Sequence, residues 1–432
     1  MATKKSNGGK KKSSSTSRAV NSTKREAVKA AKKHPKAAAA LIIAFIVLLV
    51  AAIIVVYVLK PDFFKNLFYN GNSGQDVNAG EITEISSADL SIHFLELGVA
   101  NVGDCVLIKV GDTEVLIDAG AKSNTAPTKA MLDYFDTYCT DGKIEYVIAT
   151  HAHEDHIAGL VGQQSGSTRT GFLYSYEIGT IIQFSKTNSN SVVYNNYLAA
   201  VNYCAEKGTA VYGALECVGT PIYLDQEQTI SMNILYQKYY ENTASTENNY
   251  SVCMLLTQNL GEDKSNNYLF TGDLEKSGEQ SLVESNPNLP HCVLYKGGHH
   301  GSSTSSNDVL LNKITPENIA ICTCAGTYEY ATKPSSSSNP EQAHLNTFPT
   351  QEAIERMAKY TDCVYITTLG VLNEDYSTKE FVPMNGNIVF YYGKSEEEAE
   401  KSLKLYCSNN SKKLKETEWF KNNRNMPSEW AA

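Results

Sequence analysis

Three histidines and two acidic residues share the six positions 151–156, which read His-Ala-His-Glu-Asp-His. The whole chain has only 9 histidines, so this segment concentrates metal-binding side chains. Imidazoles this close would repel one another as cations, and burial would remove their solvation, unless a positive ion occupied their lone pairs. Zinc, manganese and iron accept neutral imidazole and carboxylate as ligands. The segment predicts a divalent metal site, with a solvent-exposed polar turn as the alternative. The candidate ligands are His151, His153, Asp155 and His156.

Two later segments place similar side chains after apolar runs. Asp273 follows the run 268–272, and His299 and His300 follow the run 291–296. Glycines flank the two histidines and let the backbone approach another segment closely. We expect these three residues to join the first cluster, where the carboxylate of Asp273 could bridge two metal ions.

The surrounding sequence alternates between two patterns. Apolar runs rich in β-branched and aromatic residues predict strands at 91–97, 105–110, 114–119, 144–150, 229–236, 250–256, 268–272, 291–296, 319–324, 363–368 and 387–392. Helical patterns occur between them at 128–138, 192–206, 274–284, 308–313 and 350–360. This alternation predicts an α/β body with enough strands for two sheets, and it places the candidate ligands at strand ends.

The order HxHxDH, TGD and GHHGS, each at a strand end, resembles the metallo-β-lactamase superfamily. Within it, the pattern is most similar to the hydrolase domain of late-competence DNA-uptake proteins of the ComEC type. The likeness runs from about Ser91 to Tyr392 and includes the segments FLELG, LIDAG and LYKGGHHGSSTSS. The resemblance implies a four-layered αββα sandwich with a centre of one or two divalent ions, zinc or manganese, at one edge of the sheets.

Carried over by position, the resemblance also implies roles for single residues. His151 and His153 would hold the first metal. Asp155 and His156 would hold the second, with Asp273 as the bridge. His299 is expected to supply the remaining ligand, with His300 as the alternative. The residues expected to orient ligands or contact substrate are Asp104, Asp118, Lys296, Ser302 and His344.

Three features depart from the family pattern. No histidine lies between His156 and His291, so the middle histidine ligand of many family members is missing. The first metal would then be under-coordinated, which favours manganese or a single ion. The loop 98–104 is longer than its counterpart in the competence proteins. Phe348 stands where their pattern has a histidine; His344 could compensate, or it could be an ordinary solvated loop residue.

The expected reaction is hydrolysis by a metal-activated water. A divalent ion lowers the pKa of bound water to about 7, so no serine or cysteine nucleophile is needed. Asp155 and Asp273 are the expected proton acceptors. The resemblance favours phosphodiesters, with single-stranded DNA as a candidate among them, and a small ester, lactone or phosphoester is the second expectation. A metal-poor pseudoenzyme that serves as a surface binding module is the alternative from another class.

An apolar run separates a basic segment from an acidic body. Residues 1–60 hold 13 Lys and Arg against one acidic residue, and residues 61–432 hold 25 against 46, a net charge of −21. Such a body has no general attraction for a polyanion. The run 37–59 lacks charged residues, and as a helix it would reach roughly 34 Å, enough to cross a hydrocarbon core of about 30 Å. A cleaved signal peptide or a buried core helix is the alternative.

Positively charged flanks remain cytoplasmic, which predicts a single-pass cell-membrane protein whose body is extracytoplasmic. Residues 37–59 would contact membrane lipid. A nucleic-acid-binding arm is the alternative for the basic segment. The expected parts are a basic disordered cytoplasmic arm at 1–36, a transmembrane helix at 37–59, an extracytoplasmic tether at 60–89, a hydrolase domain at 90–394, and a charged C-terminal helix and tail at 395–432.

The 10 cysteines are too few to indicate a fold built on disulfides. Those in apolar strands are expected to pack as small hydrophobic residues. The others, Cys139, Cys204, Cys217 and Cys407, stand in less regular segments where export would permit disulfides.

Overall fold

The computed structural model describes residues 79–97, 103–120, 125–165, 168–326, 347–372, 378–394 and 398–431. All of them belong to one compact unit, Ser73–Ala432. No helix within these ranges is both long enough and apolar enough to cross a membrane. The predicted arm at 1–36, the predicted span at 37–59, and His344 lie outside the described residues.

The first sheet has eight strands in the order β18-β17-β1-β2-β3-β4-β7-β8. Strands β3, β4, β7 and β8 run parallel, so their carboxyl ends meet at one edge. The strands are β1 Leu90–Phe94, β2 Cys105–Val110, β3 Thr113–Ala119, β4 Lys143–Ala149, β7 Glu177–Gln183, β8 Ala210–Gly213, β17 Ile388–Gly393 and β18 Ser402–Cys407.

The second sheet also has eight strands, in the order β16-β15-β14-β13-β12-β11-β10-β9. Strands β12 to β15 run parallel. The strands are β9 Ile222–Tyr223, β10 Ile230–Leu235, β11 Cys253–Gly261, β12 Lys264–Phe270, β13 Leu294–Lys296, β14 Asn318–Ala325, β15 Val364–Leu372 and β16 Thr378–Pro383. A separate ribbon pairs β5 Gln164–Ser165 with β6 Thr168–Arg169.

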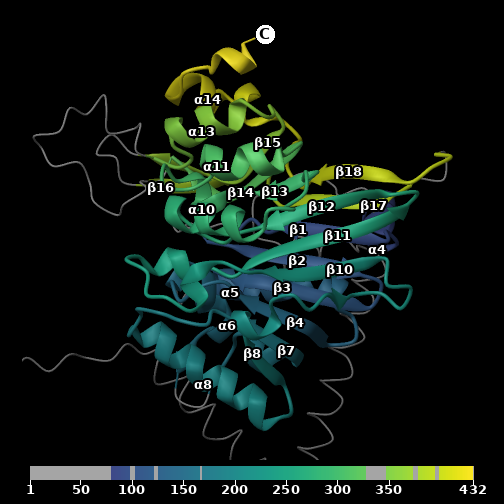
Figure 1. Ribbon diagram of the computed structural model, residues 1–432, viewed down its shortest axis with the longest axis vertical. Coiled ribbons are helices and arrows are strands. Elements are labelled where there is room, and N and C mark those ends of the chain that lie inside the picture. The colour runs from purple at the N-terminus through teal and green to yellow at the C-terminus, as the bar shows by residue number, and fades with distance from the viewer. Residues whose placement is uncertain are drawn as a thin grey trace, which may run out of the picture. The chain divides into compact units, whose positions relative to one another are not determined.

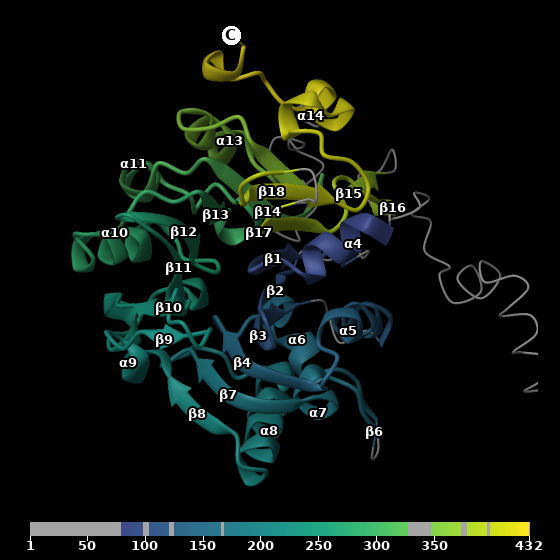
Figure 2. The same ribbon diagram turned by 90° about the vertical axis from the view of Figure 1, so that its right-hand side faces the viewer.

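Helices cover the outer side of each sheet. Figures 1 and 2 show α5, α6 and α8 on the side of the first sheet, and α10, α11 and α13 on the side of the second. This arrangement confirms the predicted four-layered αββα sandwich. The helices are α4 Ala79–Ser86, α5 Thr125–Tyr138, α6 Glu154–Val161, α7 Phe172–Ser175, α8 Val192–Glu206, α9 Ala214–Cys217, α10 Lys276–Ser285, α11 Asp308–Ile314, α13 Gln351–Ala358 and α14 Glu418–Asn423. Short 3-10 turns are η1 Lys238–Tyr240, η2 Glu247–Tyr250, η3 Gly298–Gly301, η5 Leu414–Glu416 and η6 Ser428–Trp430.

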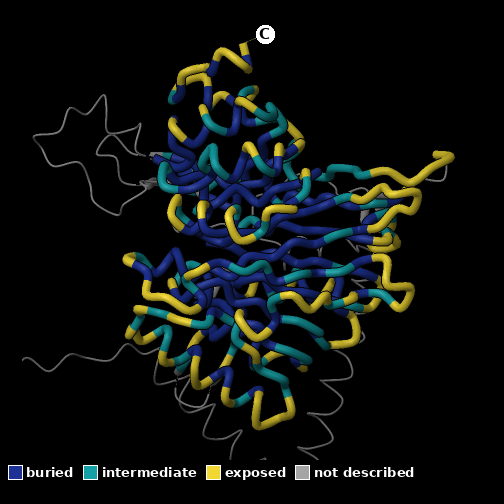
Figure 3. Tube along the Cα trace, in the orientation of Figure 1, coloured by how far each residue is buried: buried dark blue, intermediate teal, exposed yellow. Residues whose placement is uncertain are grey.

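Two apolar cores hold the layers together, and Figure 3 shows the buried strands that contribute to them. Between the sheets, the rings of Phe94 and Phe270 stack with their centroids 6.3 Å apart. Outside the second sheet, Leu282, Leu311 and Ile354 from three helices pack against its strands. Full burial of one such side chain contributes roughly 1.5–3 kcal/mol. The nine cysteines with described side chains, including the four in less regular segments, are free thiols.

The predicted boundaries at both ends of the body need correction. The tether predicted at 60–89 includes α4, which is part of the body because Ile85 is only 2% exposed. The tail predicted as a charged helix at 395–432 instead contributes β18, which pairs along β17. Apolar residues alternate in Ser402–Cys407, which suits a strand, and the acidic residues just before it misled the helix prediction. Further on, Phe420 and Trp430 are buried in the second core.

Candidate metal centre

The HxHxDH residues occupy the connection between β4 and α6. His151 and His153 lie on the loop that leaves β4, and Asp155 and His156 lie on the first turn of α6. The end of β3 packs directly against this turn. A Cβ at Gly120 would stand 1.6 Å from the backbone oxygen of Asp155, so only glycine fits there. The close packing places the turn at the edge where the parallel strands end.

Asp273 lies at the middle of the site. Its side chain is 1% exposed, and its Oδ2 is surrounded by ring nitrogens from both halves of the fold. The distances from this oxygen to Nε2 are 3.0 Å for His156, 3.2 Å for His300, 3.8 Å for His299 and 4.0 Å for His151. Four imidazole nitrogens around one carboxylate oxygen make a compact donor set.

Two more predicted ligands contact this group. His153 is exposed, and its Nδ1 lies 3.0 Å from Nε2 of His151. Asp155 is partly exposed, and its Oδ2 lies 3.4 Å from Nε2 of His300. The structure thus brings together all seven residues predicted as ligands, including both histidines of the GHHG segment.

The opposite nitrogen of each central ring contacts a fixed polar group. Nδ1 of His156 lies 2.7 Å from Oδ2 of Asp118, and Nδ1 of His300 lies 2.9 Å from the backbone oxygen of Cys322. Both partners are acceptors, so Nδ1 carries a proton and Nε2 is the nitrogen that would bind a metal ion, as in metal-ligating histidines. His299 and His151 contact hydroxyls, of Thr304 at 2.9 Å and of Thr150 at 3.1 Å.

Buried polar atoms without hydrogen-bond partners are consistent with a cation-binding site. Among the described residues, buried atoms without a hydrogen-bond partner include Nε2 of His300 and one oxygen each of Asp104 and Asp273. Burial of unpaired polar atoms is costly. The ligand atoms of Asp155, His156, Asp273 and His300 all lie within 4.8 Å of one another. These residues fit a divalent cation, which would satisfy Nε2 of His300.

The charges in the site favour the ligand forms of Asp273 and His151 but the protonated form of His300. Burial would raise the pKa of the Asp273 carboxyl, but His156 and His300 outweigh burial and hold it well below its usual range. Burial lowers the pKa of His151 well below its usual value, which keeps that ring neutral. For His300, burial would lower the pKa, but the carboxylates of Asp273 and Asp104 raise it above the usual value. In the absence of metal, a proton therefore competes for that ring.

The residues predicted to orient ligands or contact substrate do not all lie at the centre. Asp118, at φ 55° near the end of β3, holds the ring of His156 as predicted. Asp104 lies 3.3 Å from Nδ1 of His300 and forms an ion pair with Lys296. Ser302 is buried outside the cluster, where its hydroxyl accepts a hydrogen bond from the backbone N–H of Thr304 at 3.1 Å.

Several supporting residues were not predicted from the sequence. Thr150 donates to both carboxylate oxygens of Asp118, from its N–H at 2.8 Å and from its hydroxyl at 2.6 Å. Glu247 accepts the N–H of Ala152, between the first two histidines, at 3.1 Å. Thr150 directly precedes the motif, which offered a signal. Glu247 lies in an ordinary polar stretch, and nothing in its sequence surroundings distinguishes it.

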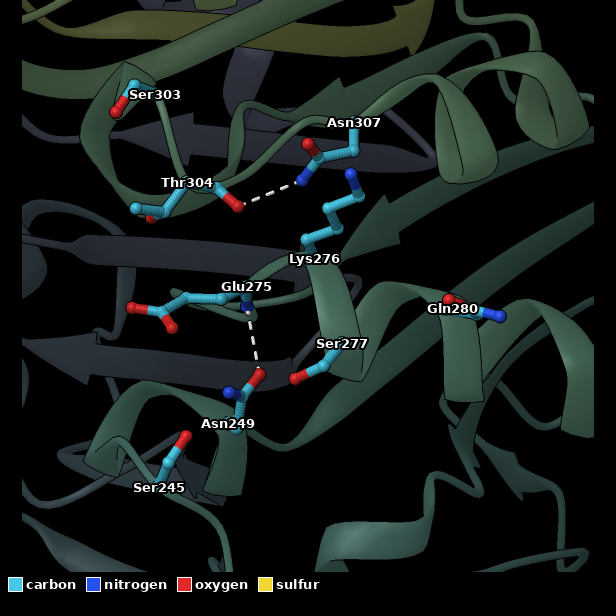
Figure 4. Close-up of a pocket in the computed structure, with 9 residues that line it drawn as sticks. All are labelled: Ser245, Asn249, Glu275, Lys276, Ser277, Gln280, Ser303, Thr304 and Asn307. Atoms are coloured by element: carbon cyan, nitrogen blue, oxygen red, sulfur yellow. Dashed lines mark hydrogen bonds between the residues drawn. The ribbon is translucent and has the colours of Figure 1, made fainter.

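A polar pocket of about 460 Å³ opens beside His299. Its residues are Ser245, Asn249, Glu275, Lys276, Ser277, Gln280, Ser303, Thr304 and Asn307. Thr304 connects it to the centre through the contact with His299 described above. Figure 4 shows Glu275 directed away from Lys276; the carboxylate of Glu275 accepts hydrogen bonds from Thr246 and Asn248, each at 2.9 Å. Apart from this pair, the lining consists of neutral side chains that form hydrogen bonds.

Comparisons with known proteins agree with this geometry. Residues 98–162 match the family model of the metallo-beta-lactamase superfamily. A 67-residue stretch is 46% identical to competence protein ComA of Neisseria gonorrhoeae and covers 15% of this chain. The stretch spans only 10% of the length of that relative.

The solved structures that align with this chain include two proteins described as metallo-beta-lactamases or as having that fold. The metallo-beta-lactamase fold protein YhfI of Bacillus subtilis aligns over 64% of this chain and 95% of its own, with 10% identity and a TM-score of 0.34. A metallo-beta-lactamase of Cronobacter sakazakii aligns over 47% of this chain and 76% of its own, with 12% identity and a TM-score of 0.28.

The family match and the site point to the same class of protein. Residues 98–162 match the metallo-β-lactamase superfamily model, and the resemblance to the competence proteins is supported by the matching stretch of ComA. A domain of this class implies divalent metal ions, and the cluster around Asp273 is where the described residues would hold them.

Proposed function

We propose that this protein is a metal-dependent hydrolase of phosphodiesters, tethered to the cell membrane with its catalytic domain outside. The convergence of four imidazole nitrogens on Oδ2 of Asp273 carries the hydrolase assignment. The proposed ligands are His151, His153, Asp155, His156, Asp273 and His300. His300 is chosen over His299 because its Nε2 lies near both Asp155 and Asp273. Zinc and manganese are the proposed ions.

A bound divalent cation would supply Lewis acidity and lower the pKa of water, which provides a nucleophile at neutral pH. The residues of the chain perform the other tasks. Asp118 and the backbone oxygen of Cys322 fix the rings of His156 and His300. Asp155 is partly exposed, so its carboxylate is placed to accept a proton at the solvent side. Gly120 and the packed strand ends keep these groups in position before substrate arrives.

The polar pocket supports a phosphodiester as substrate. Its hydroxyl and amide side chains suit a sugar–phosphate chain, and Lys276 supplies a local positive charge. This local charge matters because the body as a whole is acidic. The likeness to a competence protein makes single-stranded DNA the first substrate to test, and a small ester, lactone or phosphoester remains the second candidate.

The membrane attachment rests on the sequence of residues 1–60 alone. Residues 37–59 would form the anchor in contact with lipid, and the basic residues before it would remain cytoplasmic. Protease treatment of intact cells tests this arrangement. The body should be digested while an N-terminal tag survives, and full protection of the body would contradict the proposed orientation.

The decisive experiment compares substrates on one preparation. The purified full-length chain, loaded with manganese or zinc, is incubated with bis-p-nitrophenyl phosphate, single-stranded DNA or nitrocefin. We expect hydrolysis of the phosphodiesters, and its loss in Asp155→Ala. Hydrolysis of nitrocefin alone would refute the phosphodiester assignment. A chain that binds neither metal after careful purification would instead be the metal-poor binding module.

A further inference from the structure

Lys296 is a buried lysine at the base of the candidate metal centre. It is the last residue of β13 and is 2% exposed. Its ammonium group forms an ion pair with Asp104, lies 3.6 Å from Oδ1 of Asp273, and donates to the backbone oxygen of Gly272 at 3.2 Å. Lysine is almost never fully buried unless it is paired, and here its partners are two buried carboxylates of the centre.

The two oxygens of Asp273 therefore face different cations. Oδ1 is on the side of Lys296, whereas Oδ2 faces the ring nitrogens. Lys296 orients the carboxylate of Asp273 so that Oδ2 is available to a metal ion. The ammonium group itself lies on the Oδ1 side, away from the ring nitrogens. Asp104 precedes β2 in the first sheet, so the ion pair also joins the two halves of the fold beneath the centre.

The centre has an excess of negative charge without metal. Four carboxylates, those of Asp104, Asp118, Asp155 and Asp273, lie among the rings, and three of them are buried. Like charges held this close repel strongly in a protein interior. A permanent positive charge beside two of these acids reduces the repulsion, but the same charge also repels a divalent ion that binds to Oδ2.

We propose that Lys296 is a built-in counter-ion, which stabilises the centre while it lacks metal and limits how tightly the metal is then held. The charge of Lys296 offsets part of the negative charge that the metal ion would otherwise neutralise, so the strand ends can assemble before the ion binds. Because the same charge repels the ion, the ion remains exchangeable. The inference rests on the metal site of the proposed function but is independent of the substrate.

The test uses the full-length chain and three variants, Lys296→Met, Asp104→Asn and the double variant. Melting temperatures are measured with a chelator and with saturating Mn²⁺, and Mn²⁺ affinity is measured by calorimetry. Lys296→Met should melt lower without metal, show a larger rise in melting temperature with Mn²⁺ than the unsubstituted chain, and bind Mn²⁺ about tenfold more tightly.

The other variants separate charge from packing. Asp104→Asn should show a smaller rise with Mn²⁺, whereas the double variant, which removes one charge of each sign, should return close to the unsubstituted chain. Lys264→Met, at the start of β12 where the lysine side chain is 73% exposed, is the matched control and should change nothing.

Equal rises with Mn²⁺ in all variants would overturn the counter-ion role and leave the metal site intact. If Lys296→Met does not fold under either condition, the comparison of Asp104→Asn with the double variant decides. A rise in the double variant no larger than in Asp104→Asn overturns the proposal. Absence of any rise in the unsubstituted chain overturns the metal site itself, a different result from failure to hydrolyse phosphodiesters.

Discussion

The two nitrogens of His156 contact two different aspartates, with Nδ1 2.7 Å from Asp118 and Nε2 3.0 Å from Asp273. Asp118 thereby fixes both the tautomer and the direction of the ring, and it is itself held by two hydrogen bonds from Thr150. The ring, the carboxylate and the threonine form one support that connects β3 to the centre.

Replacement of Asp118 by asparagine should weaken this support. An amide neither attracts the Nδ1 proton as strongly nor increases the basicity of the ring. We expect the affinity for Mn²⁺ or Zn²⁺ to fall by about 10- to 100-fold, as measured by calorimetry. Asp112→Asn, at an exposed position of the turn before β3, is the control. Unchanged affinity in a natively folded Asp118→Asn chain would show that this contact does not support the metal.

The two adjacent histidines should respond differently to substitution. His300 is 1% exposed and close to both Asp155 and Asp273, whereas the side chain of His299 is 16% exposed and more distant from Asp273. We expect His300→Ala to lose bound metal, and His299→Ala to keep metal with reduced activity. Elemental analysis of the two purified variants measures this difference. The reverse pattern would make His299 the ligand.

The stability of the protein should depend on pH through Glu279, which is remote from the ligands. Burial raises its pKa from 4.5 to about 7, although hydrogen bonds from Asn307 and Ser306 oppose the rise. Between these values the folded chain keeps a proton that the unfolded chain releases. The free energy of unfolding should therefore decrease as the pH rises through this window, and this contribution should be flat above about pH 7.

The variant Glu279→Gln should lack this dependence. At about 1.4 kcal/mol per pKa unit, the contribution of Glu279 would be at most about 3.5 kcal/mol. Urea denaturation at pH 5 and pH 8 measures the difference between the two chains. The same change in stability with pH for both would show that Glu279 is already ionised in the folded protein at pH 5.

Replacement of Lys276 should weaken the binding of an oligonucleotide but not of a small phosphodiester. The pocket beside His299 contains its side chain, and Lys276 is not among the proposed ligands, so we expect it to contact the part of a longer chain next to the cleaved phosphodiester. In Lys276→Ala, we expect KM for a single-stranded oligonucleotide to rise severalfold and KM for bis-p-nitrophenyl phosphate to stay constant. Lys264→Ala is the surface control. Equal effects on both substrates would mean that the pocket does not bind the neighbouring part of the chain.

Much of the centre was predictable because each group of ligands follows an apolar run that could only be a buried strand. Parallel strands bring the ligands of each sheet to one edge, and the packing of the two sheets places Asp273 beside the HxHxDH segment. The choice between His299 and His300 could not be made in this way. Both residues have left-handed backbone angles, with φ of 46° and 56°, so neither helical nor strand periodicity tells which ring faces inward.

Other features depended on contacts between distant segments. The ion pair of Lys296 with Asp104 joins residues from different sheets, and no local pattern specifies it. Glu247 supports the HxH loop from nearly a hundred positions away along the chain. Strand β18 was missed because a short alternating segment after a run of acids is also compatible with an exposed helix.

Strand β1 lies between β2 and β17 in the first sheet. The strand that opens the body therefore acquires one of its two neighbours only when the chain is almost complete. Until then, one edge of β1 exposes unpaired backbone groups that other chains could bind. Anything that covers this edge of β1 until β17 is made would keep the incomplete chain from pairing with other chains.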